Sequence, residues 1–240
     1  MNIVEIIKDR FDKVWALIKA STNSDIYPEE SKIRLEQPIV NGKGQYIFSL
    51  KNDSVDGVVE HALNRNDVFV PTRWGLFVSL VETATGTEHL YPYIPVADGS
   101  NPSVHKFGFL TDALEALYSG FMSWTLDNNV VLSAYPLEKF RTVPQVQGAF
   151  VLDSSDQAVN EGILPEWKLD DFMTLITPRY TIAGTRDHKF TFNFPAANKT
   201  FACTSGYTAK LVFMMDGFLI KGGCEYVEGS NAFGKAAGQW

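Results

Sequence analysis

The sequence predicts a mainly β protein, an antiparallel sandwich preceded by an N-terminal amphipathic α-helix. Aromatic residues make up 13% of the 240 residues, and 18 glycines with 11 prolines supply many turns. This composition is typical of β-structure. About a dozen short runs alternate apolar and polar side chains, or are rich in β-branched and aromatic ones, with turn residues between them. A long apolar pattern with the helical repeat occurs at the N-terminus.

Residues 1–24 form the first predicted unit, an amphipathic helix and a polar linker. Apolar side chains cover about half of a helical wheel, and most charged ones fill the opposite half. The face that we expect to serve assembly or membrane contact consists of Ile3, Val4, Ile7, Phe11, Val14, Trp15 and Ile18. Three roles stay open: packing on its own domain, contact with another subunit, and attachment to a membrane surface. Equal numbers of acids and bases on the polar face argue against strong attraction to anionic lipid.

Residues 25–105 are predicted to form a first portion of the sandwich. The expected strands are residues 32–36, 45–50, 68–81 and 87–91. Pro71 interrupts the third run; because proline donates no backbone hydrogen bond, it marks a strand start, an edge or a bulge. Thr85 and Gly86 precede the fourth run and predict a hairpin there.

Residues 106–228 are predicted to form a second portion, and residues 229–240 a flexible C-terminal arm. Asp112 caps a short predicted helix that Gly120 ends. The expected strands are residues 122–125, 130–132, 172–177, 179–182, 189–194, 210–215 and 218–221. A tight turn is predicted at residues 127–129, and Asp216-Gly217 predicts a second hairpin. Two sandwiches in tandem and one elaborated sandwich both fit this division.

The residues contain no recognisable catalytic, cofactor-binding or metal-binding motif, so we expect neither an enzyme nor a cofactor. His61, His89, His105 and His188 are dispersed without metal-ligand spacing. Nucleophile elbows, phosphate-binding loops and dinucleotide fingerprints do not occur. A net charge of −7 argues against a dedicated nucleic-acid binder. The two cysteines, Cys203 and Cys224, are expected to stay unjoined, since cytosolic synthesis keeps thiols reduced.

Two stretches resemble strand–turn–strand segments of capsid proteins from tailless icosahedral bacterial viruses that enclose a membrane. The first stretch is residues 66–78 (NDVFVPTRWGLFV), leading to residues 90–93 (LYPY). The second is residues 126–132 (LDNNVVL), continuing to residues 140–147 (FRTVPQVQ). The resemblance implies a jelly-roll sandwich, single or as two jelly rolls in tandem. It also implies that the N-terminal helix faces the capsid interior or the membrane.

The function implied by this resemblance is that of a virion structural protein, a capsid shell subunit. Copies of the chain would assemble through the jelly-roll flanks into trimers or pentamers and then into a shell. Its other partners would be the viral membrane or other capsid proteins, without specific nucleic acid. The protein would be made in the host cytoplasm and reside in the virion.

The alternative function is that of a lectin-like, carbohydrate- or ligand-binding β-sandwich. Exposed Trp74, Trp124 and Trp167 would then stack on sugar rings. An enzyme on the same scaffold comes third, because the histidines do not cluster.

Overall fold

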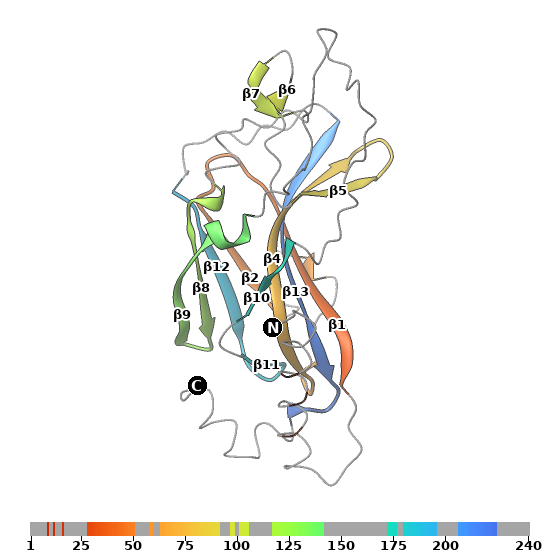
Figure 1. The fold of residues 1–240 in the computed structure, drawn as a ribbon, viewed down its shortest axis with the longest axis vertical. Coiled ribbons are helices and arrows are strands. Elements are labelled where there is room, and N and C mark those ends of the chain that lie inside the picture. Colours follow the sequence, from red (N-terminus) through yellow and green to blue (C-terminus); the bar gives the residue numbers. More distant parts are fainter. Residues whose placement is uncertain are drawn as a thin grey trace.

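Two antiparallel β-sheets face each other in this computed structural model (Figure 1). The structure describes residues 28–50, 58–59, 63–91, 97–98, 101–105, 117–141, 172–176, 180–195 and 206–224, together with Asp9, Asp12 and Ala16. The first sheet contains β1 (Glu29–Pro38), β3 (Val58–Val59), β4 (Val68–Glu82), β5 (Glu88–Tyr91), β10 (Thr174–Leu175), β11 (Ile182–Ala183) and β13 (Tyr207–Ile220). The second contains β2 (Gln45–Ser49), β8 (Phe121–Leu126), β9 (Asn129–Pro136) and β12 (His188–Asn193). A 3₁₀ helix, η1 (Leu137–Phe140), follows β9, and β6 (Ala97–Asp98) pairs with β7 (Asn101–His105) in a separate ribbon.

Strand pairing is nested, so that strands from the two ends of the chain lie together. β1 pairs with β13, β2 with β12, β4 with β10, and β8 with β9, all antiparallel. Two more pairs, β4 with β13 and β8 with β12, complete the orders β10-β4-β13-β1-β3 and β2-β12-β8-β9. Strands from residues 25–105 and from residues 106–228 therefore pair with each other in both sheets. The boundaries of those two portions stay a prediction.

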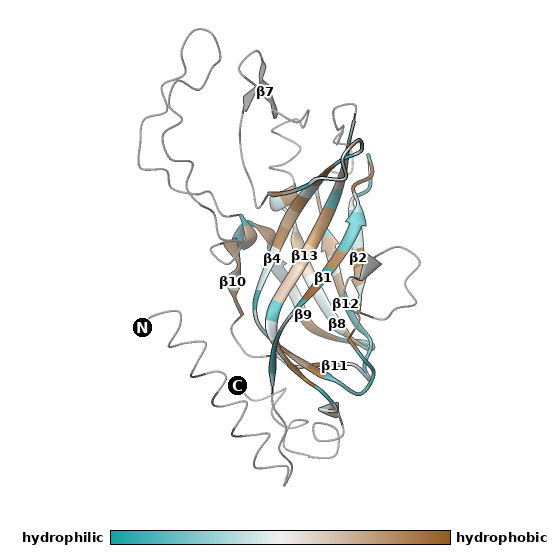
Figure 2. Ribbon diagram, turned by 90° about the vertical axis from the view of Figure 1, so that its right-hand side faces the viewer, coloured by the Kyte–Doolittle hydropathy of each residue, from teal (hydrophilic) through white to brown (hydrophobic). Residues whose placement is uncertain are grey.

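Aromatic side chains from both sheets fill the space between them. The ring of Phe213 on β13 lies 5.1 Å from the rings of both Phe190 and Phe192 on β12, and 6.4 Å from that of Phe48 on β2. The ring centre of Trp74 on β4 lies 6.2 Å from the ring centre of Phe213. Figure 2 shows hydrophobic stretches along β4 and β13, the two strands at the centre of the first sheet. The high aromatic content thus builds the core, where large rings contribute most buried area.

Most of the predicted strands that fall on described residues are confirmed. β1, β2, β4, β5 and β12 occupy the predicted runs, and Gly86 has the positive φ of the predicted turn before β5. The turn between β8 and β9 is also confirmed, with Asp127 at φ 53°. Among the described residues of two further runs, 172–177 forms the two-residue strand β10, and 179–182 forms strand only at Ile182, the first residue of β11.

Several predicted elements lie outside the described residues. These are the C-terminal arm, most of the short helix that begins at Asp112, and the N-terminal helix except Asp9, Asp12 and Ala16, which are helical. Leu117 and Tyr118, at the end of the short predicted helix, are helical as well.

The predicted hairpin at Asp216-Gly217 is wrong. β13 runs straight through both residues, and the pairing with β4 shifts register between them. Asp216 pairs with Arg73 and Gly217 pairs with Pro71, so Thr72 is the extra residue of a β-bulge. A Cβ atom on Gly217 would lie 2.1 Å from the carbonyl oxygen of Val70. Glycine is needed here because the two backbones approach closely, and not because the chain turns. Of the three roles predicted for Pro71, a strand start, an edge or a bulge, the structure shows the bulge.

Candidate functional site

The seven predicted helix residues lie outside the part of the chain that the structure describes. They are Ile3, Val4, Ile7, Phe11, Val14, Trp15 and Ile18. Their surroundings stay a prediction, and the described surfaces of the two sheets supply the candidate sites below.

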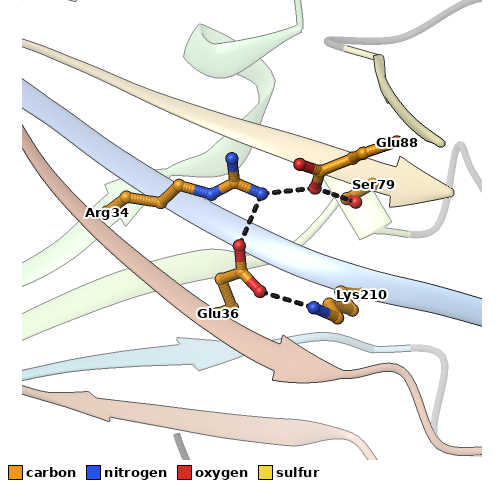
Figure 3. A network of polar contacts seen from close by, with 5 residues as sticks. All are labelled: Arg34, Glu36, Ser79, Glu88 and Lys210. Atoms are coloured by element: carbon orange, nitrogen blue, oxygen red, sulfur yellow. Dashed lines mark hydrogen bonds and ion pairs between the residues drawn. The ribbon is translucent and has the colours of Figure 1, made fainter. Parts of the chain in front are cut away.

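A charged network crosses the outer face of the first sheet (Figure 3). Arg34 on β1 donates to the carboxylate of Glu88 on β5 and also contacts Glu36. The hydroxyl of Ser79 on β4 donates to the same Glu88 oxygen. Lys210 on β13 donates to Glu36 over 2.7 Å. Four strands therefore contribute to one continuous set of ion pairs.

The alternation of β1 explains why this network forms outside the core. Ile33 and Leu35 point inward and are buried, so Arg34 and Glu36 point to the opposite face. The side chains of Arg34 and Glu36 are only 16% and 11% exposed, because the network and its neighbours cover them. Such partly buried, multiply bonded charges hold strands together more effectively than isolated surface pairs.

The carboxylate of Glu88 is held ionised by this network. Burial alone would raise its pKa, but hydrogen bonds from Arg34 and Ser79 and the charges of Arg34 and Lys210 together lower the pKa below its ordinary value. Ser79 is itself fully buried. A nucleophile needs access to substrate and a base that is free to take its proton. Ser79 and Glu88 meet neither condition, and the network is suited to fastening strands.

An apolar cluster adjoins the network on the same outer face. It consists of Phe77, Phe172, Met173, Val212 and Met214, with Leu90 packed against it. The short segment before β10 thereby covers the middle of β4 and β13. These two strands are buried on both faces, as near-continuous hydrophobic sequences indicate.

A second charged group lies beyond this cluster, beside the bulge. The carboxylate of Asp216 is 3.8 Å from Lys32 and 3.7 Å from Arg73. Charged groups thus flank the covered apolar cluster on both sides.

The outer face of the second sheet is different in character. Ile47, Phe121 and Val130 are exposed large hydrophobic residues on β2, β8 and β9. Lys189 is the one acidic or basic residue, apart from histidine, in the four strands of this sheet. It pairs with Asp187 at 2.9 Å. The described part of this face therefore combines few charges with three exposed hydrophobic side chains.

Other residues that the sequence singled out are packed inside. Trp74 and Trp124 are 2% and 1% exposed and belong to the core, while Trp167 lies outside the described residues. Cys224 is a buried free thiol, as expected; Cys203 also lies outside that part. Within the described ranges, His, Cys, Asp and Glu form no group of three that could hold a metal ion. No helix in those ranges is long and apolar enough to span a membrane.

Sequence reasoning missed the charged network entirely. The alternation in residues 32–36 predicts that Arg34 and Glu36 lie on a polar face, but it does not predict which residues they contact. Glu88 lies 54 residues from Arg34, and Lys210 lies 174 residues from Glu36. Only the pairing of distant strands brings them together.

Comparison with known proteins gives no relative: no family model, no curated protein and no solved structure matches the chain.

Proposed function

We propose that the chain is a virion structural protein, a capsid shell subunit built on a single jelly roll. The nested strand pairing carries this proposal. A jelly roll is an eight-stranded antiparallel ribbon rolled up so that its first strand pairs with its last, its second with its seventh, and so on. Taking β1, β2, β4, β8, β9, β10, β12 and β13 as those strands accounts for the four nested pairs and both sheet orders. Viral capsid domains commonly use this topology, as do lectin domains and cupins.

The two stretches that resemble capsid proteins fall on strands of this ribbon. Residues 66–78 lead into and form most of β4, and residues 126–132 form the turn between β8 and β9 with the strand ends beside it. One roll of eight strands accounts for all of the second sheet and for four strands of the first; β3, β5 and β11 are short additions to the first sheet, and β6 and β7 form a separate ribbon.

The surfaces favour assembly over catalysis. The first sheet has ion pairs and a covered apolar cluster on its outer face, and the second exposes hydrophobic side chains with little charge. In the proposed shell, copies of the chain form trimers or pentamers through the flanks of the roll. The N-terminal helix would then face the capsid interior or the membrane.

The lectin-like alternative has less support. Two of the three tryptophans that would stack on sugars, Trp74 and Trp124, are in the core and cannot reach a ligand. Binding of the isolated protein to a glycan array would favour that alternative, and an absence of binding would favour the shell subunit.

Light scattering on the purified full-length chain over a range of concentrations tests the proposal. We expect a discrete mass of three or five subunits, in line with closed cyclic assembly, and larger particles at higher concentration. A strict monomer at every concentration, from a sample with native circular dichroism, would contradict it.

A further inference from the structure

The turn at residues 184–187 joins the two sheets at one end of the sandwich. It follows β11 of the first sheet and leads into β12 of the second, at the lower end of the view in Figure 1. The turn between β8 and β9 lies against it. The amide of Asp127 donates to the carbonyl of Asp187 over 2.7 Å, and the amide of Asp187 donates to Oδ1 of Asp127 over 3.0 Å. Arg186 donates to Oδ2 of Asp127 over 2.7 Å. One side chain, that of Asp127, therefore fastens the two turns together.

His188 is the first residue of β12 and lies directly behind these turns, where it is 1% exposed. Its Nδ1 accepts a hydrogen bond from Nε1 of Trp124 over 3.2 Å. An indole N–H can only donate, so this contact requires a ring nitrogen without a proton. A protonated imidazole donates from both nitrogens and would turn a donor toward the indole N–H. The hydrogen bond as built therefore exists only while His188 is neutral.

A proton on His188 would also lack compensation at the other ring nitrogen. Nε2 is buried, and among the described residues it has no partner at hydrogen-bond distance and angle. The charged and titratable groups around the ring in this part of the chain are Asp127, Arg186, Asp187 and Lys189 at the two turns, and Tyr180 beside Trp124. The two carboxylates and the backbone of Ala183 favour a charged ring, whereas Arg186 opposes it. Burial outweighs them and lowers the pKa of His188 to about 4.

The contacts that hold this end of the sandwich are few. β11 has only two residues, and the ladder between β8 and β9 shifts register on both sides of Trp124. The side chains of Arg186 and Asp127 are 54% and 37% exposed, so their ion pair adds little stability. Segments with short ladders and exposed polar contacts open at a lower free energy than the whole domain. This end can therefore open while the centre of the sandwich stays folded.

We infer that Asp127 and residues 184–188 form an acid-sensitive corner, in which protonation of His188 releases the turn before β12 from the turn between β8 and β9. Above pH 6.5 the ring is neutral in the open and closed forms, and the corner is closed. Below pH 6.5 the open form binds a proton that the closed form excludes. Asp127 stays ionised through this range, because its pKa lies below the ordinary value of 3.8. With an ordinary pKa for His188 in the open form, the ratio of open to closed corner rises about thirtyfold between pH 7.5 and pH 5.

Hydrogen exchange of single amides in the full-length chain, followed by NMR and corrected for the intrinsic exchange rate, tests the corner. The amides of Asp127 and Leu50 donate to backbone carbonyls of the corner. The amide of Phe194 is hydrogen-bonded at the opposite end of β12. We expect protection at Asp127 and Leu50 to fall about thirtyfold from pH 7.5 to pH 5, and protection at Phe194 to stay within about twofold over the same range. An equal loss at all three amides would show that the whole sheet opens, and would overturn the inference.

Two variants assign the effect to the His188 ring. In His188→Gln the side-chain oxygen can accept from Trp124 at every pH, so the thirtyfold change should disappear. Lys189→Gln is the matched control, because Lys189 is the next residue of β12 and points outward; it should keep the full change. Persistence of the change in His188→Gln, or its loss in Lys189→Gln, would contradict the assignment to His188. The comparison of amides in the unmodified chain decides the question even if His188→Gln does not fold.

Discussion

At the scale of single residues, His188 is a buried titratable group whose protonation bears on stability. It is 1% exposed, and its Nδ1 accepts a hydrogen bond from Trp124 Nε1 over 3.2 Å. Since Nδ1 accepts, the neutral ring carries its proton on Nε2. Burial lowers the pKa of His188 to about 4, although the backbone of Ala183 and the charges of Asp127 and Asp187 act in the opposite direction. Protonation would place a cation in the core.

We predict that the protein loses stability between pH 6.5 and pH 4 through His188. Its pKa is depressed in the folded state, so below pH 6.5 the unfolded chain binds a proton that the folded chain does not. The contribution is fully present above pH 6.5 and falls by about 3 kcal/mol as the pH reaches 4. Urea unfolding of the unmodified protein and of His188→Gln, at pH 7 and pH 4.5, measures it. The glutamine can accept from Trp124 but does not titrate. Equal pH dependence in both proteins would show that His188 is not responsible.

Glu88 provides a second test at this scale. Because Arg34 and Ser79 hold its carboxylate, Glu88→Gln should lower the free energy of unfolding by about 1–2 kcal/mol at pH 7. Its pKa lies below the ordinary value, so its contribution is present above that ordinary pKa and disappears as the pH falls through the lowered one. Glu30→Gln, an exposed acid on β1, is the control and should change stability by less than about 0.5 kcal/mol. Equal effects of the two substitutions would mean that the network adds no stability.

At the scale of elements, two similar turn sequences had different outcomes. Asp127-Asn128 forms the tight turn between β8 and β9, whereas Asp216-Gly217 lies inside β13. Local sequence favours a turn at both places. The difference is non-local: β13 pairs along its length with β4 on one side and with β1 on the other, and both neighbours continue past Asp216. Alternation therefore predicted where the strands lie. The local sequence at Asp216-Gly217 could not show whether the chain turns there or continues through a bulge.

We predict that Gly217→Ala lowers the free energy of unfolding by at least about 2 kcal/mol or prevents folding. The added Cβ would meet the backbone carbonyl of Val70, which cannot move without disturbing the bulge. Gly86→Asn is the matched control. Gly86 has a positive φ, a Cβ atom added to it would meet no other atom within 4 Å, and asparagine tolerates that conformation. Thermal unfolding of the two variants should therefore differ clearly; similar melting temperatures would contradict the assigned bulge.

The candidate sites were less predictable than the strands. The outward direction of Arg34 and Glu36 follows from alternation, but the apolar cluster of Phe77 and Val212 does not. Phe77 lies on β4 and Val212 on β13, and both strands are buried on both faces. The hydrophobic pattern of such strands does not show which segment covers each face. The role of the N-terminal helix stays a prediction that rests on the distribution of its apolar residues around a helical wheel.

At the scale of the whole molecule, the helix and the sandwich are expected to be separable. The first described strand begins at Glu29, after the polar linker of residues 21–24. Deletion of residues 1–23 should therefore keep the fold and a nearly normal melting temperature, but abolish assembly or membrane attachment. Phe11→Asp should have the same effect, because it places a charge in the apolar face. Circular dichroism measures whether the fold and its melting temperature are kept, and light scattering measures whether assembly is lost. A truncated chain that unfolds, aggregates or still assembles normally would show that the helix has another role.

Electron microscopy of the concentrated full-length protein tests the shell function most directly. Rings of three or five subunits, and closed particles formed from them, are the expected result. A field of separate monomers under all conditions of concentration and ionic strength, from protein with an intact fold, would contradict it.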